Sequence, residues 1–140
     1  MVAFGKGIEA NLGNELTPRQ VQNAPQVTWE AKEGALYTLA MIDPDVPSRA
    51  YPNLSQGLHW LIVNIPGDDI GKGDVFAEYV GAGPAQGTGL HRFIYLVFRQ
   101  NGKVSDRSDI RRGFRIDVFA REHGLGTLVA GNFFQAQWHE

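Results

Sequence analysis

The chain has 140 residues, a formal net charge of −2 and no cysteine. This length is enough for one domain with a substantial core, and a chain without cysteine has neither a disulfide framework nor a thiolate metal site. The slightly acidic balance does not favour nucleic acid as a partner, and no apolar run is long enough to span a bilayer. Residues 1–10 lack the apolar core of a secretory signal, so we expect a cytoplasmic protein.

Breaker residues are frequent, with 17 glycines and 7 prolines, and this favours many short strands over long helices. Short strands are expected within residues 2–16 and at 27–29. A stronger strand is expected at 37–43, and it runs into the sequence DPDVPSR at 43–49. Neither proline of that sequence has an N–H to donate, so a stiff, extended turn should follow the strand. Asp43 then stands where a buried sheet meets solvent, a position in which binding sites are often built.

Two later segments have the composition of buried central strands. Residues 58–65 read LHWLIVNI, and a period of two predicts one face made of His59, Leu61, Val63 and Ile65. Residues 90–98 predict a second such strand. One of its faces should carry His91, Phe93, Tyr95 and Val97, and the opposite face should carry Arg92. Between them we expect a strand at 76–80 and a glycine-rich loop at 81–89.

The last third of the chain begins with a basic segment. Residues 99–121 hold seven Lys or Arg against three Asp, a pattern most often typical of a solvated face. A helix is predicted at 114–123, with Phe114, Val118 and Phe119 on one side, and a strand at 127–138. We find no repeat or linker, so the sequence predicts a single domain over 1–140, mainly β, as an antiparallel β-sandwich with one short helix.

Three polar residues stand in or beside strands that otherwise favour burial: Asp43, His59 and His91. Each histidine by itself is most often a hydrogen-bonded core residue. Together with Asp43 and the free N–H groups of the loop at 81–89, the two histidines indicate an anion site, since glycine-rich turns can direct several amides at one point. Arg92 needs a carboxylate, and Asp45 is the candidate for a structural ion pair.

Two enzymatic alternatives are weaker. Asp43, His59 and His91 could imitate a two-histidine, one-carboxylate metal site, but no HxH or HxxxH spacing supports it. Ser48 or Ser55 with a histidine and an aspartate could suggest a hydrolase, but the chain has no G-x-S-x-G elbow. We therefore expect no enzymatic activity, no metal and no cofactor.

The motifs at these residues resemble those of the phosphatidylethanolamine-binding protein family, also called the Raf kinase inhibitor proteins. Residues 43–49 match the family's DPDxPSR signature, and residues 83–92 match its GPPxGTGLHR signature. Residues 16–18, 59–67, 78–81 and 130–134 are also similar to sequences of this family, so the resemblance covers nearly the whole chain.

The resemblance implies a β-sandwich with a small surface pocket for phosphate, phosphorylethanolamine or other phospholipid head groups. By position, the ligand-binding residues would be Asp43, His59, Gly83, Pro84, His91 and Phe93. Family members are not established as enzymes, and many act on protein partners. The resemblance therefore implies a non-enzymatic protein that modulates signalling partners, or alternatively a kinase or serine-protease inhibitor with a vestigial pocket.

The chain also departs from the family pattern. Ala85 replaces a second proline, and Phe93 replaces a tyrosine whose hydroxyl reaches the phosphate. Losing one donor to a charged acceptor would weaken binding by roughly 1.5–3 kcal/mol. Members usually carry further residues before Val2 and a helix after Trp138, so the resemblance implies a short or truncated member with a more open pocket.

Overall fold

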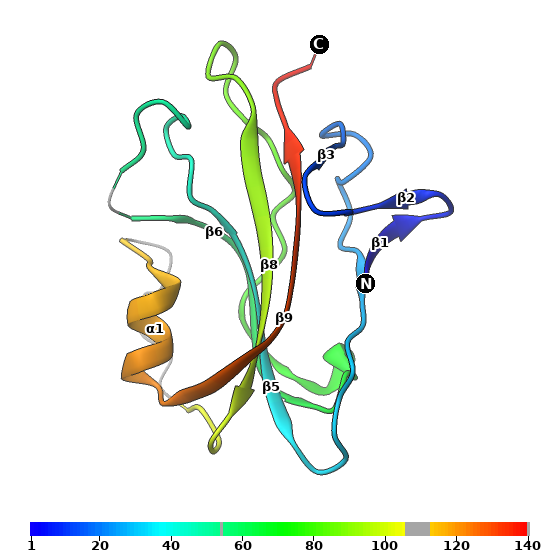
Figure 1. The fold of residues 1–140 in the computed structure, drawn as a ribbon, viewed down its shortest axis with the longest axis vertical. Coiled ribbons are helices and arrows are strands. Elements are labelled where there is room, and N and C mark those ends of the chain that lie inside the picture. Colours follow the sequence, from blue (N-terminus) through cyan, green and yellow to red (C-terminus); the bar gives the residue numbers. More distant parts are fainter. Residues whose placement is uncertain (54, 106–112, 140) are drawn as a thin grey trace.

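The computed structural model describes residues 1–53, 55–105 and 113–139, and within them the chain forms two β-sheets and one α-helix (Figure 1). The larger sheet has the strand order β3-β9-β8-β5-β6-β7. Its strands are β3 (Asn14–Glu15), β5 (Leu36–Asp43), β6 (Gly57–Pro66), β7 (Asp74–Ala77), β8 (His91–Gln100) and β9 (Leu125–Ala136). The smaller sheet, ordered β2-β1-β4, contains β1 (Val2–Gly5), β2 (Ile8–Glu9) and β4 (Gln26–Val27).

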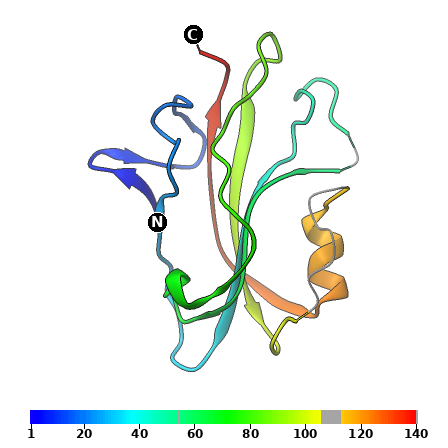
Figure 2. The ribbon, with the colours of Figure 1, turned by 180° about the vertical axis from the view of Figure 1, so that it is seen from behind.

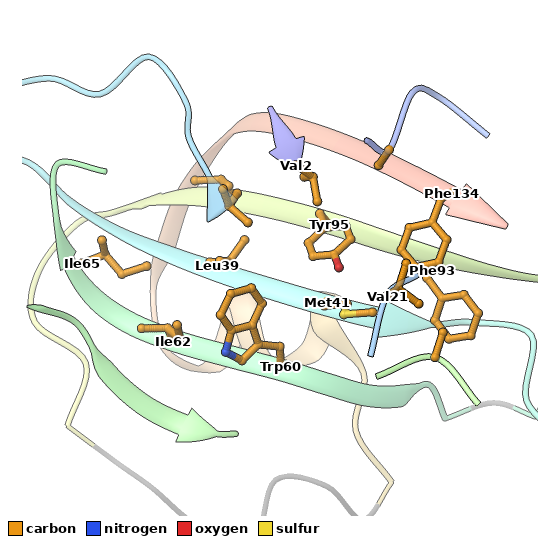
Figure 3. Close-up of a cluster of buried hydrophobic side chains, with 14 of the residues drawn as sticks. Val2, Val21, Leu39, Met41, Trp60, Ile62, Ile65, Phe93, Tyr95 and Phe134 are labelled. Atoms are coloured by element: carbon orange, nitrogen blue, oxygen red, sulfur yellow. The ribbon is translucent and has the colours of Figure 1, made fainter. Parts of the chain in front are cut away.

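The larger sheet lies between the smaller sheet on one side and the helix α1 (Ile116–Glu122) on the other (Figures 1 and 2). A first core fills the side of the smaller sheet, and its side chains include Val2, Leu39, Met41, Trp60, Phe93, Tyr95 and Phe134 (Figure 3). A second core on the helix side includes Ala40, Ile42, Leu61, Val63, Phe114 and Phe119. The predicted mainly-β sandwich with one short helix is confirmed, although β3 pairs with β9 in parallel rather than antiparallel fashion.

Strand β8 follows the simple alternation predicted for it. Phe93, Tyr95 and Val97 enter the first core, whereas Ile94, Leu96 and Phe98 pack against the second. The alternation holds because β8 pairs with β5 in an unbroken register, from Tyr37 opposite Arg99 to Ile42 opposite Ile94.

Strand β6 does not follow the face predicted for it. Its pairing register with β5 shifts twice, once opposite Met41 and Ile42 and once opposite Tyr37 and Leu39. Such irregularities insert a residue into one strand and change which side the following side chains face. As a result Leu61 and Val63 enter the second core, while Ile65 enters the first and His59 contacts Phe93 of the first. The prediction that His59, Leu61, Val63 and Ile65 share one face is therefore wrong.

Several element bounds also differ from those expected. The strand predicted at 76–80 is β7, which ends at Ala77; beyond it Val80 N donates a single hydrogen bond to His59 O, at 2.8 Å. The helix begins at Ile116, after Phe114, and ends before Gly124, which has a φ of 63°. Of the basic segment at 99–121, residues 106–112 lie outside the described part of the chain. None of the described helices has the length and hydropathy needed to cross a bilayer.

Candidate functional site

A pocket of about 340 Å³ opens at the end of the larger sheet where β5 ends and β8 begins. The segment at 44–53 and the loop that leads into β8 lie at this end of the molecule (Figures 1 and 2). All six residues that the sequence suggested for ligand binding line the pocket: Asp43, His59, Gly83, Pro84, His91 and Phe93. The other lining residues are Val46, Pro47, Ala85 and Thr88, and neither Ser48 nor Ser55 is among them.

One wall of the pocket is the proline-containing turn that follows β5. Asp43 is buried, and its Oδ1 accepts a hydrogen bond from Asp45 N at 2.8 Å. The Val46–Pro47 peptide bond is cis, and Asn53 N donates to Val46 O at 2.6 Å. These contacts close a hairpin whose base, at Val46 and Pro47, lines the pocket.

His91 connects this turn to the glycine-rich loop on the opposite wall. Its Nδ1 lies 2.7 Å from Asp43 Oδ2, and its Nε2 lies 2.9 Å from Thr88 Oγ1. Thr88 in turn donates from its backbone N and from its hydroxyl to Ala85 O, at 3.2 and 2.7 Å. A continuous hydrogen-bonded chain therefore runs from Asp43 across the pocket to Ala85.

His59 enters the pocket from the irregular part of β6. Its Nδ1 lies 2.8 Å from Val80 O, and because a carbonyl oxygen only accepts, Nδ1 must carry the proton. No hydrogen bond among the described residues uses Nε2 of His59, so this nitrogen can meet a ligand.

The floor of the pocket is Phe93, which is almost fully buried. Its ring stacks on His91 and on Phe134, with centroids 6.3 and 5.4 Å apart, and meets His59 edge-on at 5.2 Å. Both histidine rings are thus held by an aromatic side chain that brings no hydroxyl group to the pocket.

The predicted partners Asp45 and Arg92 are brought together on the other face of β8. Arg92 donates from its backbone N and its Nε to Asp45 Oδ2 at 2.8 and 2.9 Å, and from Nη2 to Oδ1 at 2.8 Å. Burial acts to raise the pKa of Asp45, but the hydrogen bonds from Arg92 and the charges of Arg92 and Arg49 together lower that pKa below its usual value. The hydrogen bonds that Arg92 donates to Asp45 raise the pKa of Arg92, whose side chain is 36% exposed.

Thr88 was not singled out from the sequence, although it lies within the matched GTGLHR motif. The available signal was its position three residues before His91, on the loop that faces that ring. Among the described residues, no group of three or more His, Cys, Asp or Glu side chains is placed to hold a metal ion. What the arrangement offers instead is one free ring nitrogen, one paired histidine and a glycine-rich loop.

Comparison with known proteins supports the resemblance suggested by the motifs. The family model described as "Phosphatidylethanolamine-binding protein" matches residues 6–134. The chain belongs to the phosphatidylethanolamine-binding protein family. Among solved structures, a phosphatidylethanolamine-binding protein from Plasmodium vivax is 24% identical, with a TM-score of 0.76 over 99% of this chain and 84% of that chain. A carboxypeptidase Y inhibitor, solved in complex with the cognate proteinase, is 24% identical, with a TM-score of 0.81 over 99% of this chain and 82% of that chain.

A secreted protein is nearer to this chain in sequence than these two structures are. The 26 kDa secreted antigen of Toxocara canis is 41% identical over 144 aligned positions, which include 97% of this chain. The chain spans 55% of the length of that relative. This secreted relative contradicts the cytoplasmic location predicted from residues 1–10, and we withdraw that prediction.

Proposed function

We propose that this family member is a non-enzymatic binding protein whose pocket takes a phosphate-bearing head group such as phosphorylethanolamine. The observation that carries the proposal is the convergence on one pocket of a free ring nitrogen on His59, the paired His91 and the loop at 81–89. Loop amides donate to phosphate oxygens, and Nε2 of His59 does so when the ring is protonated, because Nδ1 already donates to Val80 O. Glycine-rich turns suit anions because their amides can converge.

The size and lining of the pocket support a small amphiphilic ligand. A volume of about 340 Å³ lies at the lower end of the range for small-molecule sites. The walls contributed by Val46, Pro47, Pro84 and Phe93 are apolar and can contact the carbon atoms of a head group. The floor supplies no hydroxyl donor, so phosphate binding depends on the remaining donors.

The direct test is an amide NMR titration with phosphorylethanolamine. We expect saturable shifts confined to residues 43–49, 59 and 83–93, and His59→Ala should lower affinity by about tenfold, the effect of losing one hydrogen bond to a charged group. His139→Ala is a matched control, because that histidine is half-exposed and does not line the pocket. A folded protein in which no amide shifts on titration would refute the proposal.

A second candidate function is inhibition of a protease or kinase by protein contact. It is favoured by Tyr51, which is 79% exposed at the tip of the hairpin whose base, Pro47, lines the pocket. Trp138 is 40% exposed, and it follows β9 just beyond Ala136, which pairs with His91. Exposed aromatic residues are frequent anchors in protein interfaces.

This candidate can be separated from ligand binding by one substitution. Tyr51→Ser should weaken inhibition of carboxypeptidase Y while leaving the affinity for phosphorylethanolamine unchanged, since Tyr51 does not line the pocket. Absence of inhibition by the unmodified protein would exclude this protease as a partner. The secreted relative supports an extracellular place of action for either function.

A further inference from the structure

The hairpin beside the pocket contains a sequence feature that the proposed function does not use. Residues 53–55 read Asn-Leu-Ser, an acceptor sequence for N-linked glycosylation, in which Ser or Thr follows an asparagine two positions later and the residue between them is not proline. No other asparagine of the chain has Ser or Thr at that position. Leu54 lies outside the described residues, but the acceptor sequence requires only that it differ from proline. The sequence therefore contains one candidate acceptor, Asn53.

Asn53 is exposed, and its side chain is available for modification. Its backbone N donates to Val46 O at 2.6 Å, whereas its side chain makes no hydrogen bond with any described residue. In contrast, Asn14, Asn64 and Asn132 each donate from Nδ2 to an oxygen atom of the protein. An N-linked glycan is bulky and hydrated, so it requires a surface position. Asn53 meets this requirement without the loss of a hydrogen bond between described residues.

Asn53 lies beside the pocket but does not line it. Val46, which accepts the hydrogen bond from Asn53 N, and Pro47, which pairs with Pro52, are both lining residues. Neither Asn53 nor Ser55 is among the lining residues. A glycan on Asn53 would therefore stand on the hairpin that forms one wall and leave the cavity open to a small ligand.

We propose that Asn53 is an N-glycosylation site and that its glycan borders the pocket without filling it. The proposal rests on the extracellular place of action proposed above, because the secretory pathway carries out this modification, and it does not depend on the identity of the ligand. In the reaction, Nδ2 of Asn53 loses one proton and forms a bond to the anomeric carbon of a sugar. The donor is a lipid-linked oligosaccharide diphosphate: the bond from its diphosphate to that carbon breaks, and the diphosphate leaves with the bonding electrons.

The test is mass spectrometry of the protein produced through the secretory pathway of cultured mammalian cells. We expect the intact mass to exceed that of the chain by the mass of a glycan. Peptide N-glycosidase in heavy-oxygen water should remove the excess mass and convert Asn53 to a labelled aspartate. A folded protein from this pathway in which Asn53 is unmodified would overturn the proposal.

Variants of Ser55 test the acceptor sequence itself. Ser55→Ala removes the required hydroxyl, so the glycan should be lost, whereas Ser55→Thr keeps a hydroxyl and should keep the glycan. Asn23→Gln is a matched control that should not change the mass of the glycan, because Asn23 is also exposed but is followed two positions later by Pro25. Protein retained in the cells is measured with the secreted protein, so that a poorly folding variant still gives a result. A glycan that persists in Ser55→Ala would overturn the assignment.

Titration with phosphorylethanolamine tests the position of the glycan. The glycosylated protein and the unglycosylated variant Asn53→Gln, which keeps an uncharged amide, should bind with affinities within about twofold of each other, because Asn53 does not line the pocket. An affinity about tenfold weaker in the glycosylated protein would show that the glycan covers the pocket, and would overturn that part of the proposal. If neither form binds phosphorylethanolamine, the proposed function fails and the glycosylation of Asn53 stands on the mass measurement.

Discussion

Two polar clusters lie at opposite ends of the same strands, β6 and β8, and they are completed in different ways. The pocket cluster consists of Asp43, His59, Thr88 and His91. The closed cluster consists of Thr38, Asn64 and Gln100, with backbone groups of the segment that follows β8. Both include buried polar side chains on otherwise apolar strands, so burial of polar groups alone does not distinguish a site from a structural network.

In the closed cluster, the side-chain amides of Gln100 and Asn64 use all of their hydrogen-bonding capacity. The carbonyl oxygen of Gln100 accepts from Thr38 Oγ1 and Asn64 N, and its amide donates to Asn64 Oδ1 and Gly102 O, at 2.7–2.9 Å. The side-chain amide of Asn64 donates to Asp74 and to Val104 O, and its oxygen also accepts from Val104 N. The pocket cluster, in contrast, leaves Nε2 of His59 facing a cavity. An unused hydrogen-bonding group beside a cavity therefore indicates a binding site better than the burial of polar groups does.

The largest expected effect comes from opening the closed cluster. Gln100→Met keeps a similar volume but removes the hydrogen bonds that Gln100 makes with Thr38 Oγ1, the backbone N of Asn64, Asn64 Oδ1 and Gly102 O. We expect the free energy of unfolding to fall by roughly 3 kcal/mol, because several buried polar groups lose their hydrogen bonds. Urea denaturation measures this loss, and ligand affinity should not change in the folded fraction. If Gln100→Met lowered ligand affinity without lowering the free energy of unfolding, the proposed distinction between the closed cluster and the pocket cluster would be wrong.

A smaller effect is expected at the ion pair on the outer face of β8. Asp45→Asn should lower the free energy of unfolding by about 2 kcal/mol at neutral pH, a value reduced because Arg92 is partly exposed to solvent. Asp117→Asn is the matched control: it also removes an aspartate paired with an arginine, Arg115, but at an exposed site, so no measurable change is expected.

The same pair also predicts a direction for the pH dependence. Because Arg92 lowers the pKa of Asp45 in the folded protein, the unfolded chain binds the proton first as the pH falls. The usual pKa of an aspartate is 3.8. The stabilisation of the folded protein by the Asp45–Arg92 pair is therefore present at pH values above 3.8 and is lost as the pH falls below that value. The stability difference between the unmodified protein and Asp45→Asn should narrow in acid, and a constant difference would contradict this assignment.

The smallest stability effect is expected for the open residue of the pocket cluster. His59→Ala removes one hydrogen bond to Val80 O and one edge-on ring contact, so we expect a loss of about 1 kcal/mol in the free energy of unfolding. Its effect on ligand affinity should exceed its effect on stability. Thermal unfolding of His59→Ala and Gln100→Met in the same buffer compares the stability losses of the two variants. A greater loss of stability for His59→Ala would contradict the predicted order.

Much of this fold could be predicted from the sequence, because period-two apolar patterns define strands whose pairing is regular. Strand β8 illustrates this, since its register with β5 is unbroken and its two faces were predicted correctly. Strand β6 shows the limit: its apolar residues are continuous, and nothing in their pattern reveals where an extra residue enters the strand. The side on which His59 lies was therefore not predictable from spacing.

The pocket residues that carry recognisable motifs were also suggested by the sequence, and the structure places all six around one cavity. The closed cluster was missed, because Asn64 and Gln100 are 36 residues apart and meet only through the pairing of β6 and β8 with β5. Thr88 was missed for a related reason: its contact with His91 depends on the course of the loop at 81–90, which residue types alone do not specify.

The irregular position of His59 in β6 has a thermodynamic consequence for the long loop after β7. Both the backbone O and the ring Nδ1 of His59 bond Val80, and at the other end of the loop His91 bonds Thr88. The loop is therefore anchored to the sheet at two points before any ligand arrives. Its conformational entropy is largely lost on folding rather than on binding, so a ligand meets a preorganised wall.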